Sequence, residues 1–408
     1  MKQQQHFVIV GGGQSGGCAA RALRDGGFEG AITLVTEEPY PPYERPPLSK
    51  DVLMEKENYQ YCYMNPEDFY AEKNVRLLLS TRVEIIDRAN KRLDTDTGES
   101  LEYDKLLLAT GGRVRRLPIA GADLEAVYYL RNIDDMLALQ AGIKQSSSLV
   151  VIGGGFISLE VAAAARTMGL KVTVLEVLPR ILARVLEEDV GDIVQSVHEG
   201  QGVDIRTGVN VDAICGDGRV TGVRLADGEV IEADLVVIGI GIVPNTELAE
   251  AAGLEVNNGI VVNEFGETSD PDIYACGDVT QHPNSIFGKS LRLETWQNAQ
   301  SQAAAVAQVL CGERQPYRDV PWFWSDQFDM NLQMAGLSDD YDQVVRRADG
   351  TAHEITNVYL KKGVLVGVVA TNRPRDIMAA RKLIAKKVCM DVEKLADPTL
   401  DLRKAVIK

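Results

Sequence analysis

Two glycine-rich turns with the same spacing are the residues of this chain best suited to chemistry. Gly11, Gly13 and Gly16 follow one apolar run, and Gly153 and Gly155 follow another. In a G-x-G-x-x-G turn the first glycine permits the sharp bend, and the second lets backbone N–H groups approach a pyrophosphate. The N-terminus of the helix that follows favours the phosphate charge. The pair therefore predicts two dinucleotide-binding sites.

An acidic residue follows each turn at the end of the next expected strand. Glu37 ends the first of these strands and Glu176 ends the second. A carboxylate at this place accepts hydrogen bonds from ribose hydroxyls and repels a 2′-phosphate. Val177 stands where an NADPH enzyme would be expected to carry arginine. The sequence therefore favours NADH over NADPH.

Residues 39–50 form a proline-rich segment that ends at Lys50. Prolines at this density cannot join the interior of a helix or a sheet, so we expect a rigid loop. A lysine at its end could stabilise charge on a planar anionic cofactor, and a stiff surface connection is the alternative. The segment holds no cysteine. We interpret the six cysteines as reduced thiols and the four histidines as surface or loop residues without metal-ligand spacing.

The elements that position these turns repeat along the chain. Helices are expected over residues 18–24 and 159–168, after the two turns. Residues 106–112 and 234–245 are apolar strands that run into glycines, and each closes its half of the repeat. The repeat predicts a duplicated dinucleotide domain. A further short strand ends at Asp278, whose carboxylate can accept a hydrogen bond from a sugar-alcohol hydroxyl.

The order of elements predicts an α/β fold with two Rossmann-like dinucleotide-binding domains and a C-terminal α+β domain. The predicted boundaries are 1–115 with 247–320 for a discontinuous first domain, 116–246 for the second and 321–408 for the third. A chain of 408 residues is too long for one hydrophobic core. Trp322 and Trp324, two apart, would share one face of a strand in the third domain.

Composition excludes several classes of partner. The formal net charge is −16, which argues against nucleic acid and anionic membrane surfaces. No apolar run approaches the roughly 18 residues of a membrane span, and the N-terminus lacks the pattern of a cleaved signal. We therefore expect a cytoplasmic protein, as a monomer or a homodimer, with no membrane or nucleic-acid partner and no metal.

With these motifs in hand, the chain resembles the FAD- and NADH-dependent ferredoxin reductases of bacterial multicomponent oxygenase systems. The resemblance covers nearly the whole chain. The segments that carry it are residues 45–50, 109–112, 129–131, 153–160, 239–241, 276–278 and 321–327. It implies a glutathione-reductase-like architecture with FAD in the first domain and NADH in the second. It also implies electron transfer from NADH through FAD to a ferredoxin, in systems such as aromatic hydrocarbon catabolism.

The resemblance assigns roles to individual residues. Lys50 would lie near the reactive edge of the flavin and Glu160 near the nicotinamide, as catalytic residues. The residues expected at FAD are Gly11, Gly13, Ser15, Gly16, Glu37, Arg45, Pro46, Lys50, Val83, Ala109, Arg131, Asp278 and Trp296. Those expected at NADH are Gly153, Gly155, Ile157, Glu160, Glu176 and Gly241. Two residues depart from the family pattern: Ser158 replaces a glycine, with slightly looser helix packing expected, and Trp296 replaces a smaller residue.

Two features predict the electron acceptor. They are the absence of cysteine from residues 46–49 and the charge of the C-terminal domain. Residues 46–49 stand where disulfide reductases carry their cysteines, so electrons should leave the flavin directly and in single steps. Residues 323–408 carry 14 basic and 12 acidic side chains, near +2, while the rest of the chain is near −18. We expect an acidic [2Fe–2S] ferredoxin to dock near Trp324, Arg373, Arg375, Arg381, Lys382 and Lys386.

Other functions stay open at this point. A small-molecule reductase resembling monodehydroascorbate reductase or an NADH oxidase would turn over quickly with oxygen or a quinone. A redox-sensing interaction protein resembling apoptosis-inducing factor would be reduced very slowly by NADH. A solvated helix face is the alternative to a docking surface over residues 373–387.

Overall fold

The structure is a computed structural model that describes residues 5–66, 68–348, 350–351 and 353–407. It divides into two units, each described here by itself. Unit 1 consists of Met1–Glu44, Cys62–Arg113 and Val243–Pro321, and unit 2 of Arg45–Tyr61, Val114–Ile242 and Trp322–Lys408. The chain crosses from one unit to the other within β8 (Gly112–Val114) and again within β17 (Ile242–Pro244).

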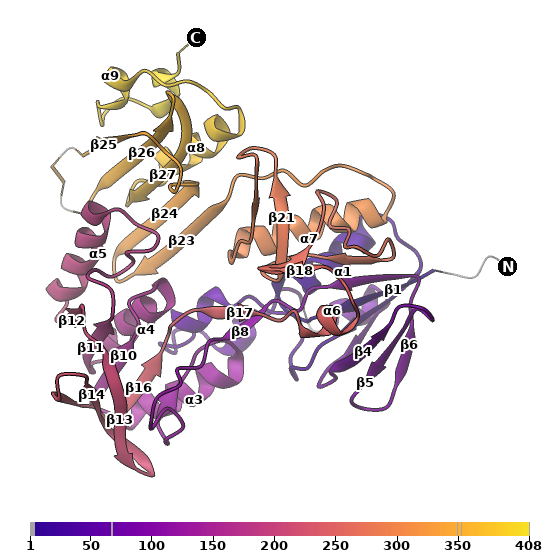
Figure 1. Cartoon of the computed structure of the whole chain (residues 1–408), viewed down its shortest axis with the longest axis horizontal. Coiled ribbons are helices and arrows are strands. Elements are labelled where there is room, and N and C mark those ends of the chain that lie inside the picture. The colour runs from indigo at the N-terminus through magenta and orange to yellow at the C-terminus, as the bar shows by residue number, and fades with distance from the viewer. Residues whose placement is uncertain (1–4, 67, 349, 352, 408) are drawn as a thin grey trace. The chain divides into compact units, whose positions relative to one another are not determined.

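A parallel sheet in the order β20-β7-β1-β2-β3 forms the centre of unit 1. Its central strand, β1, is labelled in Figure 1. Alternation along a strand sends Ile9 to one face, where it packs with Leu23 of α1 and Val306 of α7. Val8 and Val10 point to the other face. The bounds are β1 (His6–Val10), α1 (Gln14–Asp25), β2 (Ala31–Val35), β3 (Val75–Leu78), β7 (Lys105–Leu108), β20 (Ile273–Ala275) and α7 (Trp296–Leu310).

The second face of this sheet is covered by short elements from both ends of the unit. Leu93 and Leu101 of an antiparallel sheet and Ala249 of α6 join Val8 in one buried cluster. A further small sheet has the order β18-β19-β21-β22. The bounds are α2 (Phe69–Glu72), β4 (Val83–Asp87), β5 (Arg92–Thr95), β6 (Ser100–Glu102), α6 (Glu247–Ala251), β18 (Val256–Asn257), β19 (Gly259–Val261), β21 (Thr280–Asn284) and β22 (Lys289–Leu291).

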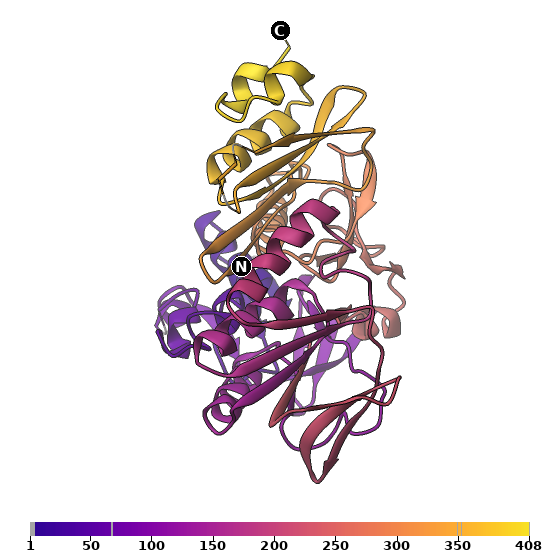
Figure 2. The same cartoon turned by 90° about the vertical axis from the view of Figure 1, so that its left-hand side faces the viewer.

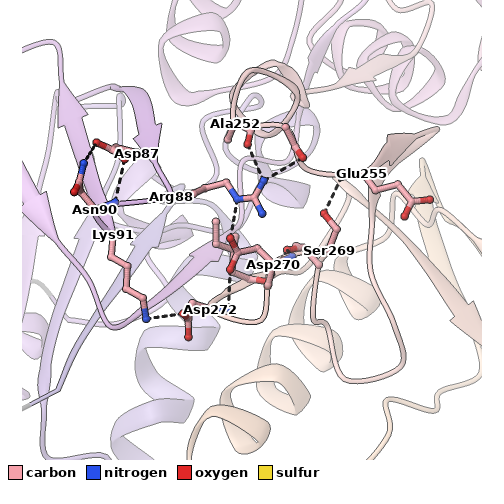
Figure 3. A network of polar contacts seen from close by, with 12 residues as sticks. Asp87, Arg88, Asn90, Lys91, Ala252, Glu255, Ser269, Asp270 and Asp272 are labelled. Atoms are coloured by element: carbon pink, nitrogen blue, oxygen red, sulfur yellow. Dashed lines mark hydrogen bonds and ion pairs between the residues drawn. The ribbon is translucent and has the colours of Figure 1, made fainter.

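A polar network ties the early part of unit 1 to the part that returns after residue 243 (Figure 3). Arg88, just after β4, donates to Asp270 Oδ2 at 2.7 Å and to the carbonyl oxygens of Ala252 and Gly253 at 3.1 and 3.2 Å. Lys91 pairs with Asp272 at 2.5 Å. These contacts fix the returning segment, which carries β20, against the β4–β5 hairpin.

Unit 2 contains a second parallel sheet, in the order β12-β11-β10-β16-β9. Val150 and Val151 of its central strand are buried, as are Leu159 of α4 and Val194 of α5. The antiparallel strands β13, β14 and β15 form a separate small sheet. The bounds are η1 (Pro46–Ser49), β9 (Val127–Tyr128), α3 (Ile133–Lys144), β10 (Ser148–Ile152), α4 (Phe156–Thr167), β11 (Lys171–Glu176), α5 (Glu188–Gly200), β12 (Asp204–Thr207), β13 (Val211–Asp217), β14 (Arg219–Leu225), β15 (Val230–Glu232) and β16 (Leu235–Ile238).

An antiparallel sheet in the order β23-β24-β27-β26-β25 completes unit 2. It runs from orange to yellow in Figures 1 and 2, and α8 packs against its β24 and β27 strands. The bounds are β23 (Trp322–Gln327), β24 (Met330–Gly336), β25 (Gln343–Arg347), β26 (Ile355–Lys361), β27 (Val364–Thr371), α8 (Pro374–Ala385), α9 (Val392–Leu395) and η3 (Leu402–Ala405).

The predicted fold class is confirmed: two Rossmann-like sheets precede a C-terminal α+β module. Both helices after the glycine turns begin earlier than expected, at Gln14 and Phe156, because Gly13 and Gly155 themselves cap them. The three-domain boundaries stay a prediction. The structure groups residues 114–242 with 322–408 in one unit and adds the segment 45–61, which the sequence assigned to the first domain.

Candidate dinucleotide sites and a buried glutamate

The first glycine turn leaves an open helix end. Gly11 has φ +117°, and a Cβ there would lie 2.2 Å from Ala109 O, so only glycine fits this close approach. Gly13 caps α1 without a side-chain hydrogen bond, and no described atom lies within 4 Å of a Cβ built on it. Backbone N–H groups therefore face open space at the positive end of a helix dipole, which fits a pyrophosphate.

Several predicted FAD residues of unit 1 surround this turn. Gly277, at φ +83°, lies so close to Ser15 that a Cβ would meet its Oγ at 2.2 Å. Asp278 therefore follows directly beside the first turn of α1. Val83 is buried in the core cluster that includes Val8, Val10 and Val35, whose strands lead to the turn.

Glu37 and Trp296 have other contacts within unit 1. Glu37 is largely exposed and pairs with Arg82 at 3.2 Å. Trp296 begins α7, and its indole lies near Glu44. Burial raises the pKa of Glu44, and the nearby polar side chains of Trp296 and Gln14 oppose that rise. The described geometry thus places Glu37 against a cation and Trp296 against a carboxyl group.

The second turn repeats this geometry in unit 2. Gly153 has φ +106°, and a Cβ there would lie 2.4 Å from Gly239 O. Gly155 caps α4 without a side-chain hydrogen bond, and within the described chain nothing lies within 4 Å of its would-be Cβ. Ser158 Oγ donates to Gly239 O at 3.0 Å, a hydrogen bond that the sequence did not predict.

The remaining predicted NADH residues flank this second turn. Glu176 accepts hydrogen bonds from Gly154 N at 2.6 Å and from Leu178 N at 2.8 Å, so its carboxylate shapes the turn. Ile157 is 47% exposed, and Gly241 is exposed at φ +98°. Backbone donors, open space and a fixed carboxylate together fit the pyrophosphate and ribose of a dinucleotide.

Glu160, on α4, lies at the centre of a buried polar cluster. Its side chain is 2% exposed, and Lys50 Nζ lies 2.8 Å from Oε2. Ser49 Oγ donates to Oε2 at 2.5 Å, and Ser325 Oγ donates to Oε1 at 2.6 Å. Opposite charge and hydroxyl donors offset the cost of burying the carboxylate. The two residues predicted to be catalytic, Lys50 and Glu160, are therefore in direct contact.

The other predicted flavin contacts in unit 2 stand on rigid turns. Pro46 opens the 3₁₀ turn η1, so the proline-rich segment does form a stiff loop. Arg45 Nη1 donates to Arg131 O at 2.5 Å, and Arg131 N donates to Asp135 Oδ2 at 2.9 Å. Burial raises the pKa of Asp135, against which hydrogen bonds from Arg131 and Asn132 act.

The predicted docking residues lie on β23 and α8. Trp322 and Trp324 stack with ring centroids 5.1 Å apart, which confirms that they share one face of a strand. The guanidinium of Arg381 lies 5.3 Å from the Trp322 ring centroid. The helix also exposes an apolar residue, Met378, at 67%. The exposed basic residues of α8 and its C-terminal end are Arg375, Lys382, Lys386 and Lys387.

Arg373 differs from the other basic residues of this surface. Its side chain is 17% exposed, lies 3.2 Å from Asp376 and donates to Pro398 O at 2.8 Å. These contacts fix the N-terminus of α8 within the module. Arg373 therefore offers less charge to a partner than the sequence pattern suggested.

Sequence reasoning missed Ser49, Ser325, Gln327 and His198. Gln327 Nε2 donates to Ser325 Oγ at 3.0 Å, and its Oε1 lies 2.8 Å from His198 Nε2. The interpretation of the histidines as surface or loop residues was wrong for His198, because α5 presents it to β23, and for His282, which is 1% exposed.

The thiols of Cys18 and Cys62 do not suit a redox relay. Burial raises the pKa of Cys18 and of Cys62 to about 11, so both stay protonated near neutral pH. Among the described residues, no group of His, Cys, Asp and Glu has a geometry that could hold a metal ion. Within the same residues, no helix is long and apolar enough to cross a membrane.

Two such turns on parallel sheets define a dinucleotide-binding oxidoreductase fold. A family model of pyridine nucleotide-disulphide oxidoreductases matches residues 5–303, and a model described as reductase C-terminal matches residues 322–406. The chain therefore belongs to the pyridine nucleotide-disulphide oxidoreductase family, and FAD and NADH are its cofactors.

Individual relatives match over nearly their full length. A rhodocoxin reductase of Rhodococcus erythropolis is 44% identical over 406 residues, covering 98% of this chain and 94% of the relative. The ferredoxin–NAD(+) reductase component of an anthranilate 1,2-dioxygenase system of Burkholderia cepacia is 41% identical, covering 97% and 98%. The solved covalent putidaredoxin reductase–putidaredoxin complex contains a chain with TM-score 0.95 and 38% identity, with 98% of each chain covered. The predicted resemblance to ferredoxin reductases is confirmed.

Proposed function

We propose that this chain is an NADH:ferredoxin reductase that supplies single electrons to a [2Fe–2S] ferredoxin of an oxygenase system. Full-length likeness to reductases of such systems supports the proposal. The observation that carries it is the loop over η1, where Ser49 hydrogen-bonds Glu160 at a place where a disulfide reductase needs thiols. When bound, FAD accepts a hydride and can release its electrons one at a time.

The residues of unit 2 have distinct roles in this scheme. Lys50 stands at the end of a rigid 3₁₀ turn, where it supplies a fixed positive charge toward the flavin. Glu160 keeps that ammonium group in place and orients the nicotinamide. Arg45, Pro46 and Arg131 line the flavin, and Glu176 binds the ribose of NADH. The remaining NADH contacts are Gly153, Gly155, Ile157 and Gly241.

Unit 1 carries its own set of proposed FAD contacts. The open α1 N-terminus binds the pyrophosphate, and Asp278 binds the ribityl chain. Glu37 binds the adenosine ribose once it exchanges its ion pair with Arg82 for sugar hydroxyls. The other residues in this group are Gly11, Gly13, Ser15, Gly16, Val83, Ala109 and Trp296.

The ferredoxin docks on the surface formed by Trp324, Arg375, Arg381, Lys382 and Lys386. The half-buried Arg381 beside Trp322, the exposed cations of α8 and the exposed Met378 side chain suit an acidic partner with an apolar centre. Arg373 supports this surface from within the module. The docking site lies on a single copy of the chain, so it serves a monomer or a homodimer equally.

The proposal is tested by reversing charge on the docking surface. Lys382→Glu raises the KM for a [2Fe–2S] ferredoxin about tenfold at low salt and leaves NADH–ferricyanide turnover unchanged. Lys73→Glu is the matched control, because this exposed lysine lies in unit 1, outside the surface. Fast turnover with oxygen or a quinone, and none with any ferredoxin, would contradict the proposal.

A further inference from the structure

The strand β23 has two faces with different contacts. Trp322 and Trp324 stack on one face, while Phe323, Ser325 and Gln327 point to the other. Phe323 packs on Phe156 of α4 with ring centroids 4.5 Å apart. Ser325 and Gln327 are 0% exposed. Burying polar groups costs free energy unless each one is hydrogen-bonded, so Ser325 and Gln327 are expected to have hydrogen-bond partners.

The hydrogen bonds of these buried groups run in one direction. Gln327 Nε2 donates to Ser325 Oγ, so the hydroxyl hydrogen of Ser325 is left for Glu160 Oε1. Gln327 Oε1 can only accept, so His198 must carry its hydrogen on Nε2. The other ring nitrogen, Nδ1, is buried without a hydrogen-bond partner among the residues that the structure describes, so no acceptor there favours a hydrogen on Nδ1.

The charge state of His198 agrees with this assignment. The ring is 0% exposed, and burial lowers the pKa of His198, so it stays neutral near pH 7. Phe328 meets it edge-on, with ring centroids 5.1 Å apart. Among the residues that the structure describes, the hydrogen-bond partner of the ring is Gln327, a neutral amide. The imidazole thus acts as a fixed, neutral donor.

The chain of donors ends on the carboxylate that also holds Lys50. Ser325 binds Oε1, whereas Ser49 and Lys50 bind Oε2. A carboxylate that accepts hydrogen bonds at both oxygens cannot rotate without losing a charge-assisted hydrogen bond. The hydrogen bond to Oε1 comes from β23 of the C-terminal module, whereas Glu160 lies on α4, the helix that follows β10 of the second parallel sheet.

We propose that Ser325, Gln327 and His198 form a positioning chain that holds Glu160 against Lys50. The inner face of β23 thereby completes the nicotinamide site, while its outer face serves the electron acceptor. None of the three residues touches substrate; each acts through the next. The inference rests on the proposed function, because it assumes that Glu160 orients the nicotinamide.

The chain is tested by removing one link at a time. In stopped-flow reduction of the bound flavin by NADH, Ser325→Ala lowers the limiting rate about tenfold and changes the NADH dissociation constant less than about twofold. Gln327→Leu and His198→Phe give progressively smaller losses. Ser325→Thr, which keeps the hydroxyl, restores most of the rate. Ser196→Ala, an exposed hydroxyl on the same helix as His198, is the matched control.

A double-variant cycle separates positioning from general damage. If Gln327 acts only through Ser325, then adding Gln327→Leu to Ser325→Ala causes no further loss of rate. Additive losses, or a normal limiting rate in Ser325→Ala, would overturn the inference. A wild-type protein that NADH does not reduce at all would instead contradict the proposed function, and the two failures are therefore distinct.

A measurement that is independent of turnover addresses His198. Nitrogen NMR of the histidine-labelled holoenzyme should show the His198 ring neutral and protonated at Nε2 near pH 7. Gln327→Leu should change its tautomer or exchange behaviour, and Ser196→Ala should not. A His198 ring protonated at Nδ1 in the wild type would exclude the donor chain.

Discussion

The two glycine turns share one backbone plan but differ in the residue that faces each turn. Gly11 N bonds Val35 O at 2.9 Å, and Gly153 N bonds Leu175 O at 2.8 Å. This register makes Thr36 the structural equivalent of Glu176. Glu37 lies one residue further along, beside the exposed Arg82. The Glu176 carboxylate therefore hydrogen-bonds within the second turn, whereas the Glu37 carboxylate lies outside the first turn.

The third glycine position also differs between the turns. A Cβ on Gly16 would lie 1.9 Å from Gly11 O, so the first turn has no room for a side chain. The second accommodates Ser158, which is 2% exposed and bonds the closing strand through Gly239 O. Spacing in the sequence identifies such turns, but the register of the strand decides which acid belongs to each.

The largest effects should come from two separate variants, in which alanine replaces the second glycine of one turn or of the other. Gly13→Ala and Gly155→Ala meet no described atom within 4 Å, so both variants should fold. The new methyl group occupies the space that a pyrophosphate needs. Gly13→Ala should purify with little FAD, while Gly155→Ala should keep its flavin and raise the KM for NADH on the order of a hundredfold.

Gly11→Ala provides the contrast for this pair. Its Cβ would clash with Ala109 O and its φ is positive, so folding itself should suffer. Flavin content, thermal melting and NADH titration measured on all three variants separate lost binding from lost structure. Equal FAD loss in Gly13→Ala and Gly155→Ala would remove the distinction between the turns.

The next effect concerns the carboxylate of the second turn. Val177 is 54% exposed, so arginine can replace it without a packing cost. Glu176→Ala combined with Val177→Arg should shift the ratio of kcat/KM for NADH over NADPH at least about tenfold toward NADPH, by replacing repulsion of a 2′-phosphate with attraction. Val177→Arg alone is the control and should shift it less, since the carboxylate remains.

A smaller effect is expected at the serine that distinguishes the second turn. Ser158→Ala keeps the Cβ and removes the hydrogen bond to Gly239 O. The free energy of unfolding should fall by about 1 kcal/mol, as measured by urea denaturation with NADH absent. An unchanged midpoint would mean that the hydroxyl contributes nothing, and the two turns would then differ only in shape.

The smallest effect should come from the first acid. Glu37 and Arg82 have side chains 63% and 67% exposed, so their ion pair is well screened. Glu37→Gln should change the free energy of unfolding by less than about 0.5 kcal/mol. A melting curve without added FAD tests this directly. A loss several times larger would show that Glu37 is part of the turn after all.

The sequence was sufficient for features that are local in the chain. Glycine spacing predicted both turns, and the alternation of Trp322 and Trp324 predicted their shared face. The cluster around Glu160 could not be found this way, because its members come from η1, α4 and β23, which are far apart in sequence. The only signal was the alternation of Ser325 and Gln327 with the tryptophans.

The order of strands has a consequence for synthesis on the ribosome. The second sheet is complete once β16 is made, because β9 precedes the turn in the chain. The first sheet must wait for β20, and its apolar face for α7. At ribosomal speed the chain between β1 and β20 takes on the order of tens of seconds to synthesise. During that interval the nascent N-terminal segment exposes Phe7 and Ile9, which makes it the part of the chain most in need of a chaperone.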